Sequence, residues 1–320
     1  MRKSTALIAA VGLLLSLTAC AGGTTTAAEA ANCVSPISGG TAANLISSKS
    51  AYGTVPKLTF PTPISTTGAE KKVLVKGTGA VVQDGSPVTL FVSQFNARTG
   101  AKISVSTYKA GGESLVIAGG SSKVAQALVC AQVGSRLAVV GSAKETHNNQ
   151  ADATQGVKKN DSIIYVLDVK QTMLAKANGS NVVPTNGVPS VVLTDTGRPG
   201  ITVPDDAAPK SFNRYVLKQG SGKKLTKGAY AVVKYTGVGW TDKKVFDSTW
   251  TADSAAILQL GATTVTEGLS KGLIGERVGS QVEIIVPPKL ASGGAAGTGG
   301  VVPSGDTGVY VVDILGIYTE

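Results

Sequence analysis

The sequence has little of what metal chemistry needs. Its 320 residues include one His and three Cys, and only 5% of them are aromatic. Because imidazole metal sites need several histidines, the lone His147 excludes a His-rich metal cage and two separate His-based sites. Charged residues are also few, at 16%, whereas 42% are hydrophobic, a balance that excludes a disordered chain and a polytopic membrane protein. We expect a chain that folds without a metal, long enough for about two domains.

The N-terminus lacks an apolar run long enough to cross a bilayer. Ala6 to Leu17 is apolar and follows Arg2 and Lys3, which is the pattern of a secretory signal. The segment ends in Leu17-Thr18-Ala19-Cys20, which resembles a bacterial lipobox and predicts a lipid on Cys20. An ordinary cleavage site beside an incidental cysteine is the alternative. We expect the lipid to hold the protein at the outer face of the bacterial cell membrane.

Basic residues exceed acidic ones, giving a net charge of +10. They are scattered as pairs such as Lys71-Lys72 and Lys158-Lys159, with no arginine-rich run and no interleaved aromatic residues. Nucleic-acid binding is therefore not expected, whereas attraction to anionic lipid headgroups is.

Two cysteines, Cys33 and Cys130, remain once Cys20 carries a lipid. An exported chain meets an oxidising exterior, so we predict one disulfide, which would stabilise the fold by roughly 3 to 4 kcal/mol. Two buried free thiols are the alternative.

The two halves of the chain repeat each other. Leu58 to Pro61 aligns with Ile201 to Pro204, and Tyr165 to Val169 aligns with Tyr310 to Ile314, at nearly the same offset. A single period of this length indicates a duplicated domain and not a solenoid.

Each copy consists mainly of β-branched or alternating segments separated by Gly-rich turns, which predicts strands. The best helical candidate is Val265 to Ile274, preceded by Thr263 and Thr264 as possible caps. We therefore expect an α+β fold with two domains, each a bent antiparallel sheet wrapped around one short helix.

The predicted organisation along the chain has five parts. Residues 1–19 form the signal peptide and residues 20–50 a flexible tether. Residues 51–176 form the first domain, residues 177–198 a linker rich in Asn, Gly and Pro, and residues 199–320 the second domain.

Five blocks in the second copy occur in an order that resembles the FKBP-type peptidyl-prolyl cis/trans isomerases. They are Val232-Val233-Lys234-Tyr235-Thr236-Gly237, Val245-Phe246-Asp247-Ser248-Thr249-Trp250, Val265 to Gly279, Ile284-Ile285-Val286-Pro287-Pro288 and Tyr310-Val311-Val312-Asp313-Ile314-Leu315. The likeness covers about 105 residues, from Arg214 to Tyr318. It implies an apolar pocket between the sheet and the helix, in which proline-containing peptides or unfolded exported proteins bind.

The resemblance also assigns roles to single residues of that pocket. It gives the catalytic positions to Tyr235, Phe246, Asp247 and Tyr310, and the substrate contacts to Val265, Thr266, Leu269, Val301 and Val302. In this assignment Asp247 lies beside the imide carbonyl of the bound proline and the backbone N–H of Thr266 is a donor. No cofactor and no metal are implied, because rotation about an amide bond needs neither.

Several positions depart from the family pattern. Leu269, Ala256 and Ser292 stand where aromatic residues are usual, which predicts weak binding and low activity. In the first copy Val92 and Val124 replace Tyr235 and Leu269, and the Phe-Asp pair falls in Ile103-Ser104-Val105, with no acid. Residues 51–176 are therefore predicted to be a degenerate domain that serves as a spacer or binding surface.

Two functions fit these observations. The first is a prolyl isomerase at the membrane surface that assists the folding of exported proteins through its C-terminal domain. The second is a non-catalytic lipoprotein that uses the same fold to bind peptides or a partner. Out of context, Tyr235 and Phe246 also fit plain core residues, and Asp247 fits a residue that caps a turn.

Overall fold

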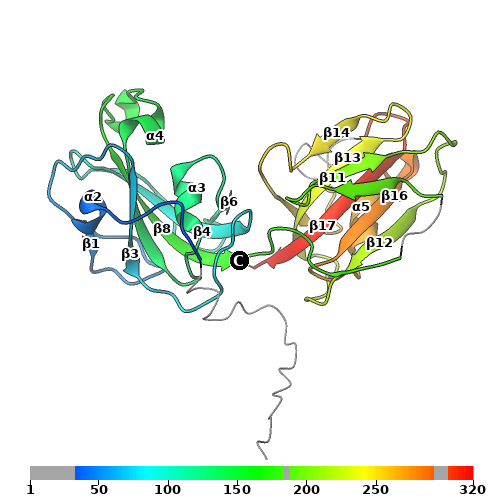
Figure 1. Cartoon of the computed structure of the whole chain (residues 1–320), viewed down its shortest axis with the longest axis horizontal. Coiled ribbons are helices and arrows are strands. Elements are labelled where there is room, and N and C mark those ends of the chain that lie inside the picture. Colours follow the sequence, from blue (N-terminus) through cyan, green and yellow to red (C-terminus); the bar gives the residue numbers. More distant parts are fainter. Residues whose placement is uncertain (1–32, 184–186, 292–301, 320) are drawn as a thin grey trace, which may run out of the picture.

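The computed structural model describes residues 33–183, 187–291 and 302–319. These residues form two sheet-based domains side by side, the first drawn in blue to green and the second in green to red (Figure 1). The predicted signal peptide, Cys20, and the predicted site residue Val301 lie outside the described residues, as does Ser292.

The first domain is built on a mainly antiparallel sheet with the strand order β3-β7-β8-β4-β5, and β6 pairs with β4. Its elements are α2 (Thr41–Asn44), β1 (Ser47–Ser48), β2 (Leu58–Thr59), β3 (Ala69–Val75), β4 (Pro87–Asn96), β5 (Lys102–Val105), β6 (Ser114–Ile117), α3 (Lys123–Leu128), β7 (Arg136–Gly141), α4 (Ala143–His147), η1 (Ala153–Gln155) and β8 (Ile163–Thr172).

The second domain has a sheet of order β14-β13-β17-β16-β12-β9, and β15 pairs with β13. Its elements are β9 (Ser180–Asn181), β10 (Ser190–Leu193), β11 (Pro199–Thr202), β12 (Asn213–Gln219), β13 (Tyr230–Gly239), β14 (Val245–Ser248), β15 (Ala256–Gln259), α5 (Glu267–Leu273), β16 (Gln281–Val286), η2 (Pro288–Leu290) and β17 (Gly308–Tyr318). Apart from β9, each strand has a counterpart at the same place in the first sheet, as an internal duplication predicts.

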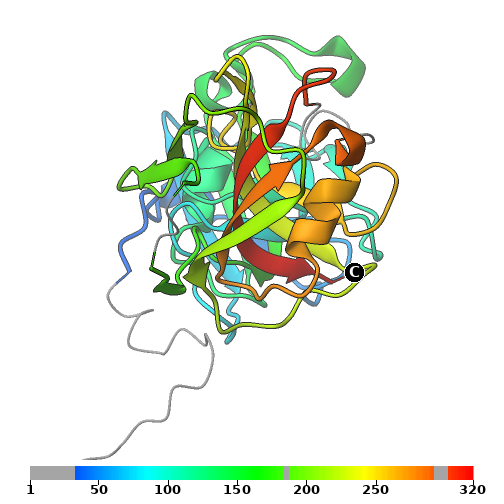
Figure 2. The ribbon, with the colours of Figure 1, turned by 90° about the vertical axis from the view of Figure 1, so that its right-hand side faces the viewer.

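The second sheet is covered on both faces. Alternate residues of β16 point to opposite sides: Ile284 joins the core with Leu269 and Leu273, whereas Ile285 packs with Trp240. In Figure 2 helix α5 (orange) lies on one side of this sheet and the β10–β11 hairpin (green) on the other. We call these the helix face and the hairpin face.

Two glycines let α5 approach the sheet closely. A Cβ atom on Gly268 would lie 2.4 Å from Cγ1 of Val286, and one on Gly272 would lie 2.4 Å from Cδ1 of Ile284. Since carbon atoms need about 3.5 Å, any larger residue would push the helix off the strand.

The predicted flexible tether of residues 20–50 is too long. From Cys33 onward the chain belongs to the first domain, because Cys33 and Cys130 form the predicted disulfide, with their Cα atoms 5.5 Å apart. Ala43 and Ile46 are fully buried against the first sheet, on the face that the β1–β2 hairpin covers, which we also call its hairpin face. Burial of these apolar side chains stabilises the segment. Its helix and strands are too short to be recognised from the sequence pattern.

The predicted linker of residues 177–198 is also largely part of a folded domain. Strand β9 pairs with β12, β10 pairs with β11, and the backbone N–H of Ala177 donates to the Asp313 carboxylate at 2.8 Å. Most of this segment therefore packs on the second domain.

Direct hydrogen bonds join the two domains. Lys234 donates from Nζ to the carbonyl of Gly85 at 3.1 Å, and the hydroxyl of Tyr318 donates to the Glu113 carboxylate at 2.9 Å. None of the helices in the described parts of the chain has the length and apolar character needed to cross a membrane.

Candidate functional site

A β-bulge between β13 and β14 positions Phe246 and Asp247. Gly237 pairs with Asp247, but the next residue, Val238, pairs with Val245, so Phe246 is the extra residue of the bulge. Its ring lies over Gly237, where a Cβ atom would be 2.5 Å from Cζ of Phe246. Gly237 therefore provides the space that the ring occupies, a role that the sequence pattern did not reveal.

Three aromatic rings gather on the helix face. The centroids of Phe246 and Tyr310 are 5.4 Å apart in an edge-to-face arrangement, and those of Tyr235 and Tyr310 are 6.4 Å apart. Such spacings are typical of attractive aromatic pairs. The hydroxyl of Tyr235 donates to Oδ2 of Asp247 at 2.5 Å, so the structure brings together all four residues predicted to be catalytic.

The turn into α5 forms the next wall. Val265, Thr266 and Leu269 are buried here, and Val265 and Leu269 belong to the same core as Tyr235 and Tyr310. The helix begins at Glu267, and its cap is Thr266, whose hydroxyl accepts from the N–H of Leu269 at 3.3 Å. The predicted caps Thr263 and Thr264 lie three and two residues before this cap, because the helix begins only at Glu267.

The side chains of this cluster are buried. Tyr235, Tyr310 and Leu269 are 0% exposed. Val302, the first residue of the described segment 302–319, packs in the same core and is 4% exposed. The Tyr310 hydroxyl has no hydrogen-bond partner of regular geometry among the described residues. Burial, followed by the charge of Asp247, raises the pKa of Tyr310 well above its usual range, so the hydroxyl stays protonated and available as a donor.

The first domain has the same bulge without the same site. Strands β4 and β5 change register at Gln94, which makes Ile103 the extra residue in place of Phe246. Gln94 stands where the second domain has Gly237, so the space for a ring is lost. The side chains of Val92 and Val124 have no polar atom, and Tyr165 is half-buried.

Within residues 33–183, 187–291 and 302–319, no three His, Cys, Asp or Glu side chains gather closely enough to hold a metal ion. The groups at the site are apolar side chains, the hydroxyls of Tyr235 and Tyr310, and the carboxylate of Asp247.

Comparisons with known proteins agree with this geometry. Residues 221–315 match the family model for FKBP-type peptidyl-prolyl cis-trans isomerases. A curated FK506-binding protein of Neisseria meningitidis is 32% identical over 103 residues, which is 32% of this chain and 92% of the relative. An FK506-binding protein of Streptomyces anulatus is 29% identical over 120 residues, covering 38% of this chain and 97% of the relative.

Solved structures of the same type also resemble the chain. The three FKBP domains of wheat FKBP73 align over 79% of this chain and 96% of that one, with 19% identity and a TM-score of 0.34. The sequence matches show that the chain belongs to the family of FKBP-type peptidyl-prolyl cis-trans isomerases, and they place the family domain in its C-terminal half.

Proposed function

We propose that the protein is a prolyl isomerase of low activity whose C-terminal domain assists the folding of exported proteins at the membrane surface. The observation that carries this proposal is the cluster of Tyr235, Phe246 and Tyr310, with the Tyr235 hydroxyl bonded to Asp247. The cluster offers an apolar wall together with polar groups at one edge, which suits a prolyl ring and its imide carbonyl.

The chemistry follows from the nature of the imide bond. Resonance sets a rotation barrier of about 18 to 20 kcal/mol, and water stabilises the planar, charge-separated form. A dry pocket withdraws that water and so favours the twisted transition state, in which the resonance is lost. Tyr235, Tyr310 and Leu269 are 0% exposed, so these side chains are already shielded from water, and the proposal requires a prolyl ring to enter among them. A barrier lower by about 5 kcal/mol corresponds to a roughly 4,000-fold acceleration.

The low activity follows from the replaced aromatic residues. Leu269 and Ala256 are both buried in the core beside the pocket, where a larger ring would offer more apolar surface to proline. Each such loss removes about 1 to 3 kcal/mol of contact.

The proposed location rests on the N-terminal sequence. Arg2, Lys3, the apolar stretch and the lipobox-like end at Cys20 support export followed by lipid anchoring. The Cys33–Cys130 disulfide fits the same history, because such bonds persist in oxidising compartments.

A second candidate function is peptide or partner binding without catalysis. It is favoured by the first domain, which keeps the fold but has Gln94 and Ile103 in place of Gly237 and Phe246. In this reading the fold persists in both domains as a binding scaffold.

Isomerisation of an Ala-Leu-Pro-Phe peptide by the full chain separates the two candidates. The isomerase proposal expects acceleration that falls by about tenfold or more in Tyr235→Phe and in Asp247→Ala, since both break the hydroxyl–carboxylate bond. Absence of acceleration by the wild type at high protein concentration would leave the binding function.

A further inference from the structure

The hairpin faces of the two domains are closed in different ways. In the first domain the hairpin pairs Ser47 with Thr59, and in the second the corresponding pair is Ser190 with Thr202. The first hairpin is pinned to its sheet by cationic side chains. The second covers a cavity of about 690 Å³, a size typical of ligand sites.

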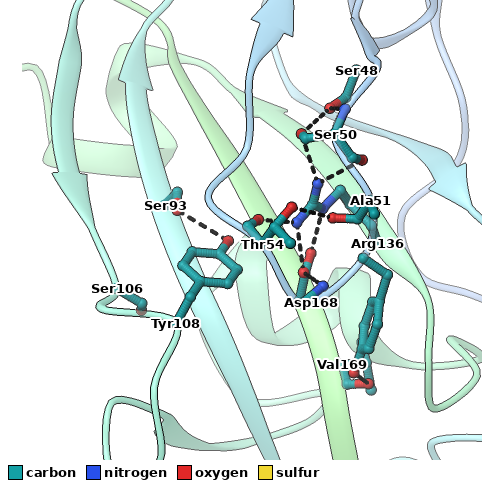
Figure 3. Close-up of polar contacts among 12 residues, drawn as sticks. Ser48, Ser50, Ala51, Thr54, Ser93, Ser106, Tyr108, Arg136, Asp168 and Val169 are labelled. Carbon is teal, nitrogen blue, oxygen red and sulfur yellow. Dashed lines mark hydrogen bonds and ion pairs between the residues drawn. The ribbon is translucent and has the colours of Figure 1, made fainter.

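In the first domain the side chain of Arg136 lies between the sheet and the loop of the hairpin (Figure 3). Its side chain is 0% exposed and pairs with both oxygens of Asp168, at 2.6 and 2.7 Å. It also donates to the carbonyls of Ser50 and Thr54 in the loop of the hairpin. Nearby, Lys72 donates to the carbonyls of Asn44 and Ile46. Two cations therefore bridge the sheet and the segment above it.

The second domain keeps one acid, Asp313, and lacks the counterparts of Arg136 and Lys72, while Arg214 and Lys218 of β12 line its cavity. Asp313 faces Gln281 across β16 and β17, in the register in which Asp168 faces Arg136. Gln281 donates to Asp313 at 2.7 Å, but it carries no charge. At the place of Lys72 the chain has Tyr215, which pairs with Glu283.

Glu283 adds a further acid to this cavity. It stands where the first domain has Ala138, lines the cavity, and is 0% exposed. Both of its carboxyl oxygens are buried without a hydrogen-bond partner in the described part of the chain. A buried acid without any donor is costly, so such a group points to a donor supplied from outside.

We propose that this cavity binds the arginine side chain of a polypeptide partner, which supplies in trans the guanidinium that Arg136 supplies in the first domain. A guanidinium offers two parallel N–H groups, matching the two unpaired oxygens of Glu283. Val188, Pro189, Val191 and Leu193 line the same cavity and give its methylene stem apolar contact. The site lies on the hairpin face, on the other side of the sheet from the aromatic cluster of Tyr235, Phe246 and Tyr310 on the helix face.

The test is a titration of the full chain with N-acetyl-L-arginine amide at pH 8, followed by NMR of the backbone amides. Burial raises the pKa of Glu283 to about 7, so its carboxyl group is largely ionised at this pH. The other titratable groups of the neighbouring strands are Arg214, Tyr215 and Lys218 on β12 and Tyr310, Asp313 and Tyr318 on β17. We expect saturable shifts around Glu283 and Val191. N-acetyl-L-citrulline amide, which is neutral, should give none.

Two variants and one control make the assignment specific. Glu283→Gln should weaken arginine binding by a factor of about 10 to 100, because a charge-assisted pair is lost. Gln281→Arg installs the arginine of the first domain and should block the cavity. Glu267→Gln removes an exposed carboxylate of α5 and should change nothing.

Some results would overturn the proposal. Equal binding of N-acetyl-L-lysine amide would exclude guanidinium recognition, and unchanged affinity in Glu283→Gln and Gln281→Arg would place the ligand elsewhere. Isomerase activity should be the same in Glu283→Gln and the wild type. The binding result stands whether or not the chain proves to be an isomerase.

Discussion

The buried carboxyl group of Glu283 should make the second domain less stable as the pH rises. Burial raises its pKa from the ordinary 4.5 to about 7. The folded domain therefore holds a proton that the unfolded chain releases, so this contribution is complete below pH 4.5 and is lost as the pH rises through 7. The interval corresponds to about 3 kcal/mol in the free energy of unfolding.

Urea unfolding followed by tryptophan fluorescence measures the free energy of unfolding of the second domain. Trp240 and Trp250 are the only tryptophans of the chain, and both belong to the second domain. Glu283→Gln has no proton to release, so its stability relative to the wild type should increase by about 3 kcal/mol between pH 4.5 and pH 8. Comparison with the wild type cancels the contribution of Asp313, whose pKa is also raised by burial.

The exposed Glu267→Gln is the control, and its difference from the wild type should stay the same across this pH range. An equal stability difference between Glu283→Gln and the wild type at both pH values would show that Glu283 has the same pKa in the folded domain as in the unfolded chain. That result would refute the reasoning from burial.

Two further substitutions test how the domains are built. Gly237→Ala places a methyl group 2.5 Å from the Phe246 ring and should lower isomerase kcat/KM by about tenfold or more, whereas Gly68→Ala, in open space, should not; equal rates for the two variants would contradict the role of the bulge. Arg136→Met leaves Asp168 buried without a counterion and should destabilise the first domain by about 3 to 5 kcal/mol in calorimetry, and an unchanged melting curve would contradict this.

The sequence predicted the larger elements well. Long alternating segments such as Tyr230–Gly239 and Gly308–Tyr318 carry their own signal, because each buries one face or both. The segment around Ile46 was assigned to the tether, since its strands have two residues each and its burial depends on a sheet formed far along the chain. The disulfide followed from counting cysteines in an exported chain.

Part of the candidate site could be predicted from the sequence, and part of it could not. The resemblance selected Tyr235, Phe246 and Tyr310, and the structure gathers them. It did not reveal that Gly237 makes room for Phe246, because a bulge is defined by pairing between strands and not by one strand. The sequence pattern did not indicate a role for Glu283 either, since a single acid within a strand does not show whether a cation lies opposite it on a neighbouring strand.

The catalytic claim is tested most directly at the bulge residue that the two domains do not share. Phe246→Leu and Ile103→Leu change the same position of the fold, one in each domain. In a prolyl isomerisation assay with the full chain, Phe246→Leu should lower the acceleration by about tenfold, because the ring that packs against Tyr310 is lost, while Ile103→Leu should leave it unchanged. Equal rates for both variants and the wild type would contradict catalysis in the C-terminal pocket.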